Sequence, residues 1–93
     1  MMKAVQIIAP GPSKVLSIVN LITPVVKSTE VLVKLSYAGV NYIDTYHRSG
    51  VYKVAALPWV LGLEGSGFVV AVGGNVKDFK VGDKVAWPSC PHR

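Results

Sequence analysis

The fold of this chain depends on residues 38–52, which read Ala38-Gly39-Val40-Asn41-Tyr42-Ile43-Asp44-Thr45-Tyr46-His47-Arg48-Ser49-Gly50-Val51-Tyr52. Asn41 is a favourable helix N-cap, because its side-chain oxygen can accept a hydrogen bond from a free amide of the first turn. Asp44 lies where a carboxylate can accept from the cap amide and meets the positive end of the helix dipole. Gly50 can end a helix, since glycine adopts the left-handed conformation at low cost. We therefore predict a strand, a tight turn and a short helix from Tyr42 to Ser49.

Polar and aromatic side chains gather where this strand ends and the helix begins. The residue types leave two interpretations open: Asn41 and Asp44 only cap the helix, or they also border a binding site. Asp44 and His47 are three positions apart and share one helix face. For that pair, a surface contact is favoured over a metal site.

The composition limits the class of protein. A chain of 93 residues allows one domain at most, and 51% hydrophobic residues are not typical of disorder. No apolar run approaches the roughly 18 residues of a membrane span, and the N-terminus lacks a secretory signal. The single Cys90 cannot form an internal disulfide, as is usual in a reducing compartment. We expect a soluble, cytoplasmic protein without membrane contacts.

The net charge of +5 comes from scattered lysines and arginines. Nucleic-acid binding proteins usually cluster such residues on one face, with aromatics between them. The pattern therefore disfavours nucleic acid as a partner and is compatible with a modest attraction for anionic ligands.

Strand-like segments dominate the rest of the chain. Alternation is clearest from Glu30 to Ala38, where Val31, Val33, Leu35 and Tyr37 fall on one face. Residues 51–60 look irregular, and 68–72 look like a buried strand. The pattern predicts a mainly β fold with one short helix, as a small barrel or sandwich. The other strands are expected at Lys3 to Ala9, Val15 to Ile22 and within Val81 to Trp87.

A glycine-rich segment, Gly62-x-x-Gly65-x-Gly67, invites comparison with nucleotide-binding loops. No P-loop lysine follows it, and it leads into a strand rather than opening a helix. We interpret these glycines as positions of close backbone approach or of a bend.

Metal and acid–base chemistry have little support from spacing. Zinc sites usually show paired cysteines or histidines, and no such spacing links the possible ligands Asp44, His47, Glu64, Cys90 and His92. Glu64 stands among apolar and glycine neighbours, where an unpaired buried carboxylate is costly. It is expected to pair with a basic group or to lie near a site. No serine lies in a nucleophile elbow.

Three ordered motifs resemble the zeta-crystallin-type quinone oxidoreductases of the medium-chain dehydrogenase/reductase superfamily. The resemblance runs from about Met2 to Trp87. It rests on Gly39-Val40-Asn41-Tyr42-Ile43-Asp44-Thr45-Tyr46-x-Arg48-Ser49-Gly50-x-Tyr52, on Pro58-x-Val60-x-Gly62-x-Glu64-Gly65-Ser66-Gly67 and on Val72-Gly73-x-x-Val76-x-x-Phe79-x-x-Gly82-Asp83-x-Val85.

The resemblance implies a GroES-like N-terminal domain, a distorted small barrel that is incomplete here. It assigns residues 1–87 to this partial domain and leaves 88–93 as a divergent tail. It also implies NADPH-dependent reduction of quinones or related enones, by one electron or by hydride. The family's Rossmann domain does not follow in these 93 residues. We therefore expect a truncated chain that is inactive alone.

The resemblance also implies a zinc-independent protein. In zinc-dependent alcohol dehydrogenases of the superfamily, a cysteine and a histidine ligand occupy the places of Asn41 and Leu63. Neither residue here can replace a thiolate or an imidazole on zinc.

Site residues follow from the resemblance by position. Asn41, Asp44 and Tyr52 are the candidate catalytic residues, with Tyr52 positioning the quinone ring. Asn41 and Tyr46 could hydrogen-bond the cofactor or the substrate carbonyl, whereas the chemistry itself belongs to the nicotinamide. The cofactor-binding set comprises Asn41, Tyr42, Asp44 and Tyr46. His47 departs from the aliphatic residue expected there and receives no role.

Two functions remain open at this point. The chain is either the N-terminal catalytic portion of an NADPH-dependent quinone oxidoreductase or a non-enzymatic GroES-like piece. The second would act in interaction or regulation, by pairing with the full-length enzyme or with itself, since incomplete sheets expose strand edges.

Overall fold

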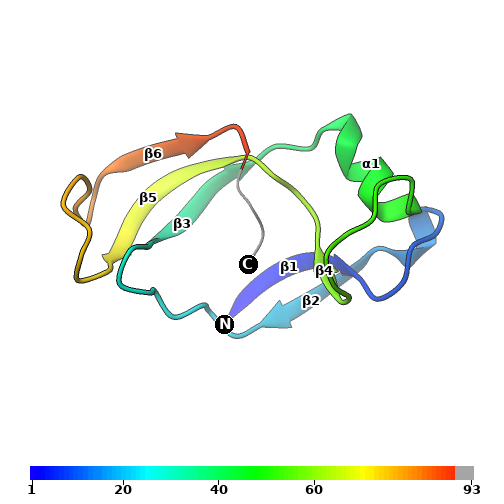
Figure 1. The fold of residues 1–93 in the computed structure, drawn as a ribbon, viewed down its shortest axis with the longest axis horizontal. Helices are drawn as coiled ribbons and strands as arrows, with labels where there is room; N and C mark the ends of the chain where they lie inside the picture. The colour runs from blue at the N-terminus through cyan, green and yellow to red at the C-terminus, as the bar shows by residue number, and fades with distance from the viewer. Residues whose placement is uncertain (90–93) are drawn as a thin grey trace. The chain divides into compact units, whose positions relative to one another are not determined.

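The computed structural model describes residues 1–89, and its contacts divide the chain into two compact units. The first unit combines residues 1–23 with 40–62, and the second combines 24–39 with the chain from residue 63 onward. Each unit holds one three-stranded antiparallel sheet (Figure 1). The prediction of a mainly β fold with one short α-helix is confirmed, and no sheet of the described residues closes into a barrel.

The sheet of the first unit has the strand order β2-β1-β4. The central strand β1 (Met2–Ile7) pairs along most of its length with β2 (Ser17–Leu21) and by two residues with β4 (Trp59–Val60). Ile7 is fully buried at the end of β1, where it pairs with Trp59. The core of this small unit therefore lies where its short third strand is added.

Two strand predictions in the first unit need correction. The predicted strand from Val15 begins later, because a 3₁₀ turn, η1 (Ser13–Val15), comes before it. In this turn Leu16 N–H donates to the carbonyl of Ser13 over 3.2 Å. The predicted irregular segment 51–60 ends in strand β4, which was missed.

The sheet of the second unit has the order β3-β5-β6. Its strands are β3 (Val31–Ala38), β5 (Gly65–Val72) and β6 (Lys84–Trp87). Val69 in the central strand is only 1% exposed and forms the centre of this core. No helix of the described residues is both long and apolar enough to span a membrane.

The predicted alternation of residues 30–38 does not hold along the whole strand. Register shifts occur between Leu32 and Val33 and between Leu35 and Tyr37. Bulges of this kind turn side chains away from the face that strict alternation would give them. Leu35 and Tyr37 are therefore exposed, and the predicted buried strand β5 also exposes alternate residues such as Val70.

Close backbone approach explains one of the glycines in β5. A Cβ at Gly67 would overlap the carbonyl group of Lys34 on the paired strand. This confirms the predicted close backbone approach at Gly67, whereas a Cβ at Gly62 would meet no atom within 4 Å. Because Gly65 to Gly67 take part in the pairing, β5 begins three residues before the predicted Phe68. The predicted divergent tail lies mostly outside the described residues, as do Cys90 and His92.

Candidate functional site

The helix α1 spans Tyr42–Ser49, with the bounds that the sequence predicts. Asn41 is its N-cap, in an extended conformation, and forms a capping box with Asp44. Asp44 Oδ2 accepts a hydrogen bond from the Asn41 N–H over 2.9 Å. At the other end Gly50 has φ 90°, and its N–H donates to the carbonyl of Tyr46 over 3.1 Å. Local sequence therefore sets both ends of this helix.

Asp44 is buried, with 8% of its surface exposed. The interpretation of Asp44 and His47 as a surface contact is therefore wrong for the carboxylate. Asp44 Oδ1 and His47 Nδ1 are buried atoms that have no hydrogen-bond partner. Among the buried side-chain nitrogen and oxygen atoms of residues 1–89, these two lack a hydrogen-bond partner.

The C-terminal end of α1 is fixed to the loop before η1. Gly11 N–H donates to the carbonyl of Arg48 over 2.9 Å, and Arg48 Nε donates back to the Gly11 carbonyl over 3.2 Å. A cationic side chain is also favourable at this end of a helix dipole. The helix is thus held at both ends, which gives the side chains between them a fixed support.

An aromatic row runs along α1 and the segment after it; we use this name for Tyr42, Tyr46, Tyr52, His47 and Trp59. Neighbouring ring centroids lie 5.6 Å apart for the first pair and 5.2 Å apart for Tyr46 and Tyr52. His47 contacts both Tyr52 and Trp59, at 6.4 and 6.5 Å. These separations and the tilted or edge-on geometry are typical of favourable aromatic pairs.

One part of the aromatic row faces solvent. Tyr42 is 77% and Tyr52 51% exposed, whereas Tyr46 lies between them and is partly buried. Asn41 is exposed at the start of the same helix. The corner therefore presents phenol rings and an amide next to each other, which suits a flat, uncharged ligand with hydrogen-bonding oxygens.

The five residues predicted for the site are linked by contacts within the first unit. Asn41 is hydrogen-bonded to Asp44, and the ring of Tyr46 contacts those of Tyr42 and Tyr52. Sequence reasoning missed the two inner members of the aromatic row, His47 and Trp59. The shared helix face of Asp44 and His47 was the signal for the first. Trp59 reaches the row from strand β4, and no local pattern indicated that contact.

Glu64 belongs to the second unit, where its carboxyl group lies against the backbone of Gly39. The two residues are also joined by a hydrogen bond from Gly39 N–H to the Glu64 carbonyl, at 3.4 Å. They border a shallow hollow of about 250 Å³, together with Tyr37, Ala38, Gly65, Ser66, Ala86 and Trp87.

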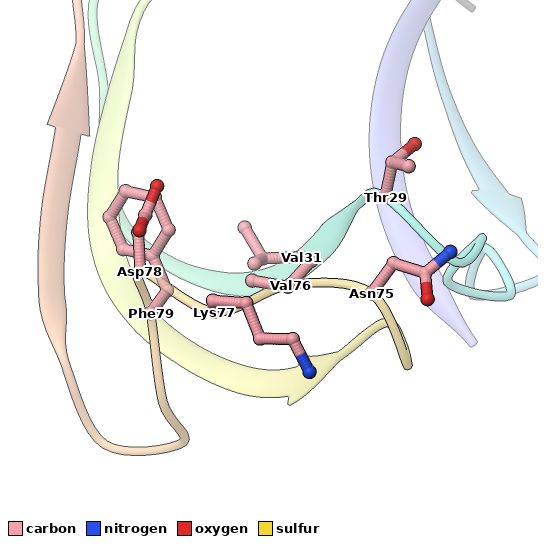
Figure 2. Close-up of a pocket in the computed structure, with 7 residues that line it drawn as sticks. All are labelled: Thr29, Val31, Asn75, Val76, Lys77, Asp78 and Phe79. Carbon is pink, nitrogen blue, oxygen red and sulfur yellow. The ribbon is translucent and has the colours of Figure 1, made fainter.

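A second hollow in the same unit, of about 420 Å³, is shown in Figure 2. Val31 and Val76 lie at its middle, with the polar side chains of Thr29 and Asn75 toward one side. Lys77, Asp78 and Phe79 complete the lining. Across residues 1–89, no three side chains of His, Cys, Asp or Glu gather closely enough to hold a metal ion.

The described residues combine two small antiparallel sheets with one short α-helix that is capped at both ends. Residues 27–93 match the family described as alcohol dehydrogenase GroES-like domain, and the chain belongs to this family.

Several of the proteins that this chain resembles are named quinone oxidoreductases, and others are named alcohol dehydrogenases. A probable quinone oxidoreductase of Schizosaccharomyces pombe is 46% identical over 89% of this chain, which corresponds to 25% of that protein. The structure of Escherichia coli quinone oxidoreductase complexed with NADPH superposes with a TM-score of 0.94 at 34% identity, over 97% of this chain and 28% of that one. A Pseudomonas syringae quinone oxidoreductase gives the same score at 43% identity, over 98% and 28%. The chain thus spans about a quarter of the length of the relatives it matches.

Proposed function

We propose that this chain supplies the residues that contact the nicotinamide and the quinone in an NADPH-dependent quinone reductase. The observation that carries the proposal is the exposed part of the aromatic row beside the capped start of α1. The names of the relatives support the substrate class, and the NADPH complex of one of them supports the cofactor. We further propose that residues 1–87 belong to one GroES-like domain.

The residues present fit both ligands. Nicotinamide and quinone rings are flat and carry carbonyl oxygens, which match phenol rings and hydroxyl donors. Tyr52 and Tyr42 are exposed aromatic residues, and Asn41 and Tyr46 carry groups that can hydrogen-bond a carboxamide or a quinone oxygen. The Asp44 carboxylate is buried under the cap, so its part is to hold Asn41 in place.

When bound, NADPH would supply the hydride, and a quinone that gains a hydride and a proton becomes a hydroquinone. The chain's own residues orient the reactants. Tyr52 would stack on the quinone ring, while Asn41 and Tyr46 would fix its carbonyl oxygens relative to the nicotinamide. Orientation of this kind can account for a large share of a rate enhancement without a strong acid or base in the protein.

We propose that the reaction needs no zinc. The family resemblance places Asn41 and Leu63 where zinc-dependent alcohol dehydrogenases carry a cysteine and a histidine ligand, and neither residue can replace a thiolate or an imidazole on zinc. Elemental analysis of the purified chain is expected to find zinc well below one equivalent. One equivalent retained through dialysis against a chelator would contradict the proposal.

Ligand binding by the pure chain tests the site. Duroquinone is a suitable probe, because its fully substituted ring does not add the thiol of Cys90. We expect Tyr52→Ala to weaken duroquinone binding by roughly tenfold, which is the loss of about 1.4 kcal/mol of stacking. Tyr37→Ala is the matched control, since Tyr37 is 78% exposed on β3 in the other unit. Equal effects of the two variants would contradict the proposed site.

The alternative function, a non-enzymatic interaction piece, is supported by the edge strand β2. This strand exposes Ile18, and the chain after it exposes Ile22. Such an edge can pair with another strand. Size-exclusion chromatography with and without a full-length relative distinguishes the two functions, because the alternative requires a complex. We also expect no turnover of NADPH and quinone by the 93 residues alone.

A further inference from the structure

The side chains of Asp44 and His47, in the first unit, each leave one buried polar atom unsatisfied. Nδ1 of His47 and Oδ1 of Asp44 are both buried, and neither has a hydrogen-bond partner. Buried polar atoms of native proteins are almost always paired, because losing contact with water is costly. A carboxylate oxygen is an especially costly atom to leave alone.

Both atoms are shielded from bulk solvent, so a partner has to come from within the unit. The helix offers one. Residues three positions apart in an α-helix lie on one face, with Cβ atoms about 5–6 Å apart. At that separation, small side-chain rotations bring an imidazole nitrogen to a carboxylate oxygen. Oδ2 of Asp44 keeps its bond to the Asn41 N–H, so Oδ1 is the oxygen available.

We propose that Asp44 and His47 form a hydrogen-bonded pair, with His47 Nδ1–H donating to Asp44 Oδ1, and that this pair positions Tyr52. The bond places the proton on Nδ1 and leaves Nε2 as the acceptor of the neutral ring. It also fixes the plane of the imidazole, which contacts Tyr52 and Trp59. His47 thereby becomes a positioning residue between the helix cap and the exposed ring of Tyr52.

The Asp44–His47 pair would link Asn41, at the start of α1, to Tyr52, in the segment after the helix. Asp44 binds the cap amide of Asn41 through one oxygen and would orient His47 through the other. Asp44 would then set the position of Asn41 and, through His47, the orientation of Tyr52. The hydrogen-bonded pair itself does not depend on the ligand, whereas its effect on quinone binding rests on the proposed function.

The direct test is the tautomer of His47 in the pure chain. Nitrogen-15 spectra of the imidazoles, recorded at alkaline pH, separate a protonated nitrogen from a bare one. His92→Asn leaves His47 as the only histidine and so assigns its signals. We expect Nδ1 of His47 to carry the proton and Nε2 to be bare. A proton on Nε2, or an average over both nitrogens, would overturn the pair.

A pair of variants then tests positioning. His47→Phe keeps an aromatic ring without the donor, and His47→Asn keeps a donor near the place of Nδ1 without the ring. If the pair positions Tyr52, both weaken duroquinone binding by about fivefold, which corresponds to roughly 1 kcal/mol. Full affinity in His47→Phe would overturn the positioning role. If the unchanged chain binds no duroquinone, the positioning role and the proposed function both fail for this chain, while the tautomer still decides the hydrogen-bonded pair.

Discussion

Removing the Asp44 side chain tests the structural centre of the site. Asp44→Ala deletes the acceptor of the Asn41 N–H, a hydrogen bond of 2.9 Å in a partly buried position. Loss of a cap costs about 1 kcal/mol, and loss of a negative charge at a helix N-terminus about 0.3–1 kcal/mol more. Loss of the proposed bond to His47 adds to this sum. We therefore expect the free energy of unfolding to fall by about 2 kcal/mol.

For a domain of this size, about 2 kcal/mol corresponds to a fall in Tm of roughly 8–16 °C. Thermal unfolding followed by circular dichroism measures the change. Glu30→Ala is the matched control, because Glu30 Oε1 accepts the Lys27 N–H over 3.0 Å at the same spacing but in an exposed position. That variant should change stability by less than about 0.5 kcal/mol.

The opposite result for Asp44→Ala is informative as well. If Oδ1 is an unpaired buried carboxylate oxygen, removing it relieves a cost of about 1–3 kcal/mol and offsets the loss of the cap. An unchanged or raised Tm would therefore contradict the Asp44–His47 pair, because it would show that Oδ1 is buried without a partner.

Two further predictions concern the second unit. Gly67→Ala should lower the free energy of unfolding by more than about 2 kcal/mol, since its Cβ would overlap the carbonyl of Lys34, whereas Gly74→Ala meets no atom within 4 Å and should be nearly neutral in a urea titration. The pKa of Asp83 lies below its usual value because its carboxylate accepts the Lys80 N–H and is paired with the Lys80 ammonium. A lowered native pKa stabilises the fold above the unfolded value near 3.9, and this stabilisation disappears as the pH falls through the native pKa. Asp83→Asn should thus be slightly less stable than the unchanged chain at neutral pH and equal to it in acid; a difference that persists in acid would contradict this cause.

The helix was predictable because its signals are local. Asn41, Asp44 and Gly50 each act within one turn of the helix end that they determine, so the sequence alone sets the bounds of α1. The close approach at Gly67 was predictable too, because a glycine inside a strand weakens it and usually marks a bend or a neighbouring backbone.

What could not be predicted depends on pairing between distant residues. Strand β4 exists because Trp59 and Val60 pair with Ile7 and Gln6, and no local pattern indicates such a short strand. The shifts in register between β3 and β5 likewise depend on the partner strand, and they expose Leu35 despite its alternating position.

The candidate site likewise combines features that local sequence predicts with features that depend on packing. The five predicted residues follow from one continuous segment and its family resemblance. The burial of Asp44 and the contact of His47 with Trp59 depend on how the segment packs within its own unit. Residue types alone therefore indicated a surface pair where the structure has a buried carboxylate.

The central claim is that the corner from Asn41 to Tyr52 holds the nicotinamide. The most direct measurement is a titration of the nitrogen-15-labelled chain with reduced nicotinamide mononucleotide, the nicotinamide half of NADPH, followed by amide chemical shifts. We predict saturable shifts concentrated in residues 41–52 that are lost in Tyr52→Ala and kept in Tyr37→Ala. Shifts without saturation, or shifts centred on strands β3 and β5, would contradict the account.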